Sequence, residues 1–161
     1  MVNGQWVSDC TLESDLELYF PDQYVPSDSE RMLLYRELDG LHTDDQLVAY
    51  RKRLIDRFGA VPHVGEELMR VVPLRRLGKS LGCEKIFLKQ QRMTLFFVSQ
   101  QDSPYYQSDA FGSILNFVAC HPRRCQFREM HGKRSVVITD VATVEAAVQL
   151  LQQVANEKSP E

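Results

Sequence analysis

The chain has 161 residues, of which 43% are hydrophobic and 25% are charged, and its formal net charge is −3. This length and composition are typical of one globular domain with a hydrophobic core. No apolar run approaches the roughly 20 residues of a membrane span and no signal-peptide pattern opens the chain, so no membrane contact and a cytoplasmic location are expected. The opening residues carry no cap or packing pattern, which suits a piece cut from a longer protein.

The first half of the chain is predicted to form one strand and three helices. Ser27 with Glu30, and Thr43 with Gln46, each fit a capping box that opens a helix. Pro73 falls inside the third helix and should kink it, because proline removes a backbone bond. The expected ranges are a strand at 11–20, which could extend back to 5–7, and helices at 28–39, 43–58 and 64–81. The residues available for burial in the first helix are Met32, Leu33, Tyr35 and Leu38.

In the second half the hydrophobic period changes to that of strands. Two hairpins are predicted, with Gln90-Gln91 and His131-Gly132 at their turns. Asp109 can cap a helix between them, and a last helix should bury Val144, Ala147, Val148 and Leu151. The expected ranges are strands at 85–88 and 93–98, a turn at 103–106, a helix at 110–120, strands at 124–130 and 134–139, a helix at 141–154, and a frayed tail at 156–161. This order, β-α-α-α-β-β-α-β-β-α, predicts an α+β fold with helices packed on a small, mostly antiparallel sheet.

The helix that ends at Phe58 has one apolar side and one polar side. Asp56 lies on the polar side, one turn after Lys52 and Arg53. An acid at the centre of a polar face adds nothing to a core, so it faces either water or a partner. Gly59 suits the left-handed position that follows a helix, and Pro62 prevents its continuation.

Acidic residues concentrate in the first 45 positions, where eleven of them stand against Arg31 and Arg36. Two interpretations stay open. The acids can form a solvated face, or they can meet a basic surface on another domain, where complementary charge guides docking more than it adds affinity.

The sequence contains none of the common catalytic patterns. It has no glycine-rich phosphate loop and no nucleophile elbow. Four potential metal ligands lie within twelve residues, but they lack the C-x-x-C pair that zinc sites favour, so reduced free thiols are the ordinary alternative. These ligands are Cys120, His121, Cys125 and His131, while Cys10 and Cys83 stand alone.

Basic residues gather on the second predicted hairpin. They are candidates for nucleic-acid contact, because basic hairpins with nearby aromatics grip phosphates and stack bases. Against this stand Glu129 among them and the frequent use of arginine as a solubilising residue on edge strands. The candidate residues are Arg123, Arg124, Arg128, Lys133 and Arg134, with Tyr105, Tyr106 and Phe127 as the possible aromatics.

Three separate motifs occur in a fixed order: Tyr24-Val25-Pro26, Arg31 with Tyr35, and residues 54–59. Together they closely resemble the C-terminal domain of the bacterial transcription-repair coupling factor, Mfd. The similarity is strong over residues 15–100 and beyond them covers only the order of the elements. It implies a lead-in from a preceding motor region at 1–14, a C-terminal regulatory domain at 15–155 and a disordered tail at 156–161.

In the family that the chain resembles, the full protein recognises stalled RNA polymerase, translocates on duplex DNA and recruits UvrA. The resemblance implies that this domain folds back onto the UvrB-like N-terminal module, masks UvrA binding and restrains the motor. It also implies that the chain alone is not an enzyme and has no catalytic, cofactor or metal site, since ATP and Mg²⁺ belong to the parent motor.

The resemblance places the interdomain docking site at Asp56, with Lys52, Arg53 and Ala49 beside it. The family commonly has an acid where this chain has Arg53. Arg57 is expected to pair with acids of the first helix, such as Glu37, and so to hold the two helices in register. Two alternatives stay open: a DNA- or polymerase-contacting module on the basic hairpin, and a structural cap that stabilises the motor.

Overall fold

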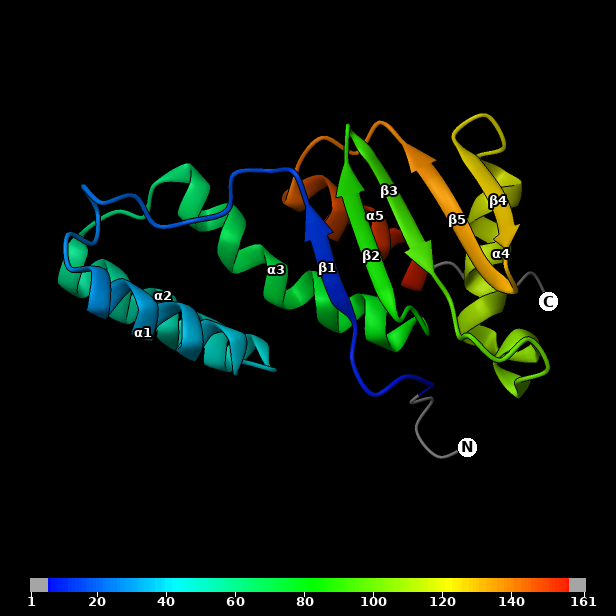
Figure 1. Cartoon of the computed structure of the whole chain (residues 1–161), viewed down its shortest axis with the longest axis horizontal. Helices are drawn as coiled ribbons and strands as arrows, with labels where there is room; N and C mark the ends of the chain where they lie inside the picture. The colour runs from blue at the N-terminus through cyan, green and yellow to red at the C-terminus, as the bar shows by residue number, and fades with distance from the viewer. Residues whose placement is uncertain (1–5, 157–161) are drawn as a thin grey trace. The chain divides into compact units, whose positions relative to one another are not determined.

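The computed structural model describes residues 6–156, so residues 157–161 of the predicted tail and residues 1–5 of the predicted lead-in lie outside the described residues, while Asn156 ends the last helix. These residues form two units, one from residues 17–73 and one from residues 6–16 with 74–156. The boundary between Pro73 and Leu74 falls inside helix α3 (His63–Ser80). Pro73 lies within this helix as expected, and the kink there stays a prediction. Figure 1 shows the elements of both units.

The helical unit holds α1 (Asp28–Asp39), α2 (Asp44–Phe58) and the first part of α3. The capping box at the start of α2 is complete, since the Thr43 hydroxyl accepts from the Gln46 N–H and the Gln46 side chain accepts from the Thr43 N–H. At the end of α2, Gly59 has a φ of +87° and its N–H donates to the Ile55 carbonyl. These ends agree with the predicted helix ranges.

The core of the helical unit is formed by the segment before α1 together with α1, α2 and the first part of α3. Its buried members are Phe20, Tyr24, Val25, Leu38, Tyr50, Leu54, Met69 and Val72. The prediction for α1 was wrong at two positions, because Met32 and Leu33 are 55% and 60% exposed. Leu34 packs against the core in their place. In the run Met-Leu-Leu, only the third residue lies one helical turn before Leu38 and therefore on its face.

The other unit is built on a mixed sheet with the strand order β1-β2-β3-β5-β4. β1 pairs with β2 in parallel, and every other pair is antiparallel. The strands are β1 (Thr11–Ser14), β2 (Lys85–Lys89), β3 (Arg92–Phe96), β4 (Cys125–Met130) and β5 (Lys133–Thr139). Gln90 and Gln91 have φ values of +54° and +60°, which is the left-handed geometry of a tight hairpin turn.

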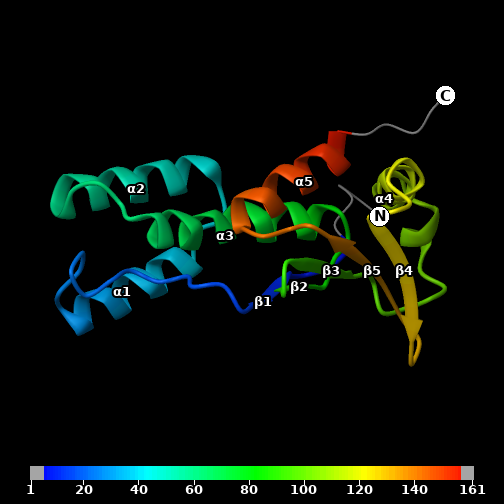
Figure 2. The same ribbon diagram turned by 90° about the horizontal axis from the view of Figure 1, so that it is seen from above.

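Helices α4 (Asp109–Cys120) and α5 (Val144–Asn156) cover one face of this sheet together with the end of α3 (Figure 2). The strand residues on that face are buried, among them Ile86, Leu88, Met93, Leu95 and Ile138. α5 buries Val144, Ala147 and Leu151 as predicted. Leu150 and Val154 are also buried, whereas Val148 is only half-buried. The predicted α+β class and element order are confirmed.

Three local predictions need correction. The first strand ends at Ser14 rather than at residue 20, and residues 6–10 form no strand; Trp6 packs edge-on against Tyr105 instead. The predicted turn near 103–106 is a short 3-10 helix, η2 (Pro104–Gln107). The cap of α4 is Ser108, whose hydroxyl accepts from the Phe111 N–H, and not Asp109. Across residues 6–156, no helix is long and apolar enough to cross a membrane.

Candidate functional site

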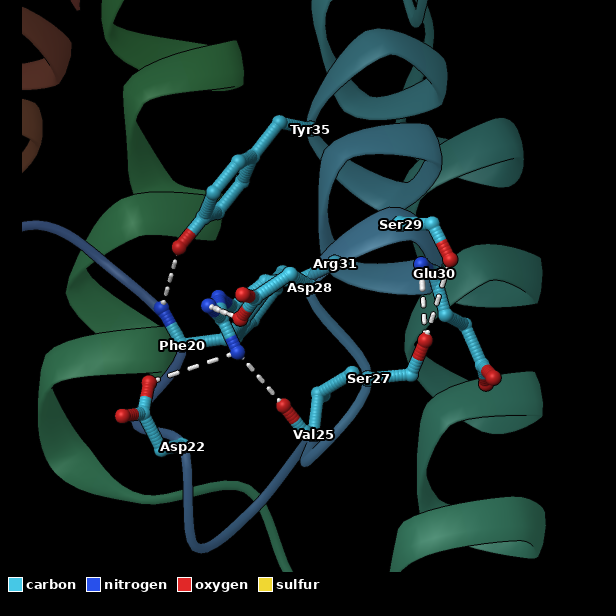
Figure 3. Close-up of polar contacts among 9 residues, drawn as sticks. All are labelled: Phe20, Asp22, Val25, Ser27, Asp28, Ser29, Glu30, Arg31 and Tyr35. Atoms are coloured by element: carbon cyan, nitrogen blue, oxygen red, sulfur yellow. Dashed lines mark hydrogen bonds and ion pairs between the residues drawn. The ribbon is translucent and has the colours of Figure 1, made fainter.

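The turn before α1 is fixed by Arg31, which the sequence had singled out (Figure 3). Its guanidinium donates to the Val25 carbonyl at 2.7 Å and pairs with Asp22 at 3.3 Å and with Asp28. Val25 is fully buried, so its backbone carbonyl needs a hydrogen-bond donor, and Arg31 supplies one. The Asp28 carboxylate also raises the pKa of Arg31.

Tyr35 makes the second tie between α1 and the preceding chain. Its hydroxyl accepts from the Phe20 N–H at 3.0 Å (Figure 3), and its ring stacks on that of Phe20 with centroids 5.6 Å apart. Arg31 and Tyr35 therefore position the turn and α1. The Ser27 hydroxyl accepts from the Glu30 N–H, but the Glu30 carboxylate pairs with Arg57, so only half of the predicted capping box forms.

The outer face of α2 is the candidate docking surface, defined here as Ala49, Lys52, Arg53 and Asp56. All four residues are exposed. Within the described part of the chain, neither Asp56 nor Lys52 makes a hydrogen bond or ion pair. A lysine four residues before an acid is the less favourable order for a helical ion pair, which fits the absence of this one. The Asp56 carboxylate is thus available to a partner.

Arg53 and Arg57 are held by acids of α1. Arg57 pairs with Glu30 through two bonds of 2.9 Å, and Arg53 pairs with Glu37. Arg57 therefore pairs with an acid of α1 as predicted, although that acid is Glu30 and the example Glu37 pairs with Arg53 instead. α2 presents Arg53 and Arg57 one turn apart, and the α1 acids lie two turns apart, so each arginine reaches a different acid. Pairing leaves Arg53 less free to repel an incoming cation.

A groove of about 560 Å³ runs between α1 and α2 beside this surface. Leu34, Leu54 and Phe58 line it as apolar side chains, and the two arginine–glutamate pairs line it as polar ones. Leu33, which is 60% exposed, also lies along it. An apolar groove with charged walls has the composition that is typical of protein–protein interfaces, with an apolar centre and a polar rim.

The cations of the basic hairpin, which is the second candidate site, lie on different faces of the sheet. Arg128 and Lys133 lie on the sheet face opposite the helices, by their register with Ser135 and Met130. Arg134 lies on the helix side, with its guanidinium 4.4 Å from the Tyr106 ring centroid. Arg124 donates to the carbonyls of Thr139 and Asp140. Arg123 is exposed in the preceding turn, and Tyr105 is fully buried. The five cations therefore do not form one surface.

The four possible metal ligands are also dispersed. Cys120 is exposed at the end of α4, while Cys125 is buried on β4. His121 stacks on Phe117 and bonds its carbonyl through Nδ1 at 2.9 Å, and His131 lies in the β4–β5 turn. Among residues 6–156, no group of three or more histidine, cysteine or acidic side chains could hold a metal ion.

The cysteines differ strongly in expected reactivity. Burial raises the pKa of Cys10 to about 12 and that of Cys83 well above its ordinary value, and it also raises the pKa of Cys125. Because the thiolate is the reactive form, we expect a thiol reagent at mildly alkaline pH to modify Cys120 alone in the native protein. Ellman titration should then count one fast thiol before denaturation and four after it. Replacing Cys120 by serine should remove the fast phase, and a second fast thiol would contradict this picture.

Residues 14–108 match the TRCF domain family, and this range is more than half of the chain. The chain belongs to the TRCF domain family. The matched range of this TRCF domain includes Asp56 and the groove, and it ends before the basic hairpin. The candidate docking surface thus lies in the part of the chain that defines the family.

The relatives of this TRCF domain are much longer proteins. It is 25% identical over 118 residues to the transcription-repair-coupling factor of Rickettsia bellii, which covers 73% of this chain and 10% of the relative. It is 30% identical over 66 residues to the factor of Escherichia coli K12, covering 41% and 6%. The chain therefore spans about a tenth of the length of these curated relatives or less.

A solved structure described as the C-terminal domain of transcription-repair coupling factor has the same fold as this TRCF domain. The TM-score is 0.68 at 16% identity, and the match covers 94% of this chain and 99% of the other. The helical unit and the sheet thus both have counterparts in the C-terminal domain of such a factor.

Proposed function

We propose that this TRCF domain is a non-catalytic, autoinhibitory C-terminal domain of a transcription-repair coupling factor. It docks on the UvrB-like N-terminal module of the same protein. In the docked state it masks the surface that binds UvrA and restrains the ATP-driven DNA translocase that displaces stalled RNA polymerase. ATP and Mg²⁺ act in the motor region of the parent protein and not in this chain.

The observation that carries this proposal is the unpaired Asp56 on the exposed face of α2. An exposed carboxylate beside an apolar groove suits a contact that must form and release. Charge at the rim of an interface orients the partners and is weakened by salt, while the apolar groove contributes buried area. A closed state held by a few kcal/mol can be opened by binding of polymerase or DNA elsewhere in the factor.

Arg53 adapts the docking surface to this chain. Where the family resemblance leads us to expect a second acid, this chain has a guanidinium already neutralised by Glu37. We infer that the partner surface is contacted by Asp56 and the groove residues, with Lys52 and Ala49 at the edge of the contact.

The test uses the chain and the separately produced N-terminal module of its own factor. We expect calorimetry to detect binding, and we expect added UvrA to compete with it. Asp56→Arg should weaken binding about tenfold, because it replaces an attractive contact by a repulsive one. In the full-length factor, the same change should increase UvrA capture and ATPase activity.

Glu17→Arg is the matched control, since Glu17 is exposed in the same unit, has no partner among the described residues and lies outside α2. It makes the same change in net charge and should leave binding unaltered. Equal binding by the Asp56 variant and the control would remove Asp56 from the docking surface. Unchanged UvrA capture after deletion of the whole domain would instead favour a purely structural cap.

A further inference from the structure

One face of the sheet carries no helix within residues 6–16 and 74–156, and Figure 1 looks directly onto it. We call it the open face. The pairing register identifies its residues, because side chains directly opposite one another on paired strands share a face. One row across the sheet runs Thr11, Lys85, Phe96, Ser135 and Arg128, and the next runs Glu13, Phe87, Thr94, Val137 and Gln126.

Two aromatic rings lie on the open face. Phe87 on β2 and Phe96 on β3 are both half-buried, and their centroids are 5.1 Å apart in an edge-to-face pair. Both rings are on the sheet side away from the core that the helices cover. Phenylalanines on the exposed side of an antiparallel sheet can stack nucleic-acid bases, since every base has a π-face.

The charge of the open face is opposite to that of the chain. Although the whole chain is negative, the strands place one acid, Glu13, on this face. The cations that share it are Lys85, Lys89, Arg92, Arg128 and Lys133. Three of them make no side-chain hydrogen bond or ion pair within the described residues, and these are Arg92, Arg128 and Lys133. On the same hairpin, Arg134 and Arg124 contact protein groups. The two strand cations of the hairpin that have no partner among the described residues, Arg128 and Lys133, therefore both lie on the open face.

We propose that the open face binds single-stranded nucleic acid, with Phe87 and Phe96 stacking bases and the unpaired cations contacting phosphates. From β2 to β4 the sheet spans three strand spacings, about 14 Å. This distance suits two or three nucleotides, the number that a comparable sheet stacks in RNA-recognition domains. Lone aromatic or basic residues would not specify a single strand, whereas rings with cations on both sides of them do.

Glu13 controls access to one ring in the free protein. It pairs with Lys85 at 2.9 Å and with Lys89 at 3.3 Å, and both ammonium groups lie over the Phe87 ring, at 4.6 and 5.0 Å from its centroid. Surface ion pairs of this kind contribute little stability, so a phosphate can replace the carboxylate as the partner of the lysines. Binding then turns the ammonium groups away from the ring and exposes it to a base.

The test measures fluorescence anisotropy of labelled oligothymidine, oligouridine and a mixed-sequence duplex with the whole chain at low salt. Both single strands should bind at least about tenfold more tightly than the duplex. Arg92→Gln/Arg128→Gln/Lys133→Gln should weaken binding more than tenfold and reduce the slope of log K against log salt by about 2. A preference between the two single strands would show that the protein reads the sugar 2′-hydroxyl, the thymine methyl group or both.

Arg36→Gln/Arg51→Gln/Lys79→Gln removes the same charge from outside the open face and the docking surface, and should bind as the unmodified chain does. Phe87→Leu and Phe96→Leu keep apolar volume but remove the π-face, and each should weaken binding about tenfold. If a phenylalanine variant unfolds, the open-face cation variant decides alone, because Arg92, Arg128 and Lys133 are exposed and their replacement should leave the fold intact.

Three outcomes would overturn the proposal. The first is no binding of either single strand by the unmodified chain. The second is an equal loss of affinity in the two triple variants, which would indicate attraction by net charge alone. The third is full binding by folded leucine variants, which would show that Phe87 and Phe96 do not stack bases.

Discussion

Gly82→Ala is expected to lower the free energy of unfolding by about 3 kcal/mol or more. Gly82 follows α3 with a φ of +82°, a conformation that side chains other than glycine rarely adopt. A Cβ at this position would overlap the ring of Tyr105. That ring cannot move aside easily, because it is fully buried and its hydroxyl donates to the Leu81 carbonyl at 2.5 Å. Thermal and urea unfolding of the variant measure the loss.

Two other glycines separate the backbone effect from the overlap. Gly59 has a φ of +87° but no atom within 4 Å of an added Cβ, so Gly59→Ala should lose about 1 kcal/mol. At Gly40 the φ is −90° and the nearest atom is 3.5 Å away, so Gly40→Ala should change stability by less than about 0.5 kcal/mol. Equal losses at Gly82 and Gly59 would show that Tyr105 does not resist the new methyl group.

Leu54→Ala should lower the free energy of unfolding by about 3 kcal/mol. Leu54 is 2% exposed in the core of the helical unit, where α2 packs against α1 and the residue 20–25 turn. Truncation removes buried methyl groups and leaves a cavity. Because the Tyr24 hydroxyl donates to the Gly59 carbonyl at 2.8 Å, the neighbouring aromatic residues are held in place and cannot fill that cavity freely. Urea denaturation, with the fitted slope compared to the unmodified chain, measures this loss.

Val48→Ala is the control on the same helix. Val48 is 67% exposed, so its truncation should change stability by no more than about 0.5 kcal/mol. A loss at Val48 similar to that at Leu54 would mean that α2 buries a different face from the one described.

The ends of the elements were the best predicted part of the fold, because their signals are local. Thr43 with Gln46 marks the start of α2, and Gly59 marks its end. The residues that form each of these caps lie within one helical turn of each other in the sequence. The β2–β3 turn was also predicted, although it uses Gln90 and Gln91 in left-handed geometry instead of glycine or asparagine. In each case the deciding contacts lie between neighbours in the chain.

Features that depend on distant partners were predicted less well. The alternation of residues 11–20 continues beyond Ser14, but β2 has no residues left to pair with it after Lys89. Glu30 fits a capping box by its spacing, yet its carboxylate bonds Arg57, which lies 27 residues away. Local spacing cannot show which of two competing partners a side chain will choose.

The candidate sites illustrate the same limit. The exposure of Asp56 was predictable from helical periodicity alone. The grouping of five cations on the hairpin in the sequence did not predict a shared surface. A strand sends alternate side chains to opposite faces of the sheet, so neighbouring cations are separated. The open face joins residues of all five strands, and only the register reveals it. Periodicity within each strand shows which of its side chains share a face, but the strand order and register are needed to show which strands contribute to the same face.

The order in which the sheet is synthesised differs from the order in which it can pair. β1 leaves the ribosome first, but its partner β2 follows only after residues 17–73, since Thr11 pairs with Lys85. Local hairpins close faster than contacts between residues far apart in sequence. We therefore expect folding of the sheet to start from β2–β3 and β4–β5, with β1 joining as an edge strand at a later step, after the helical residues between them have been made.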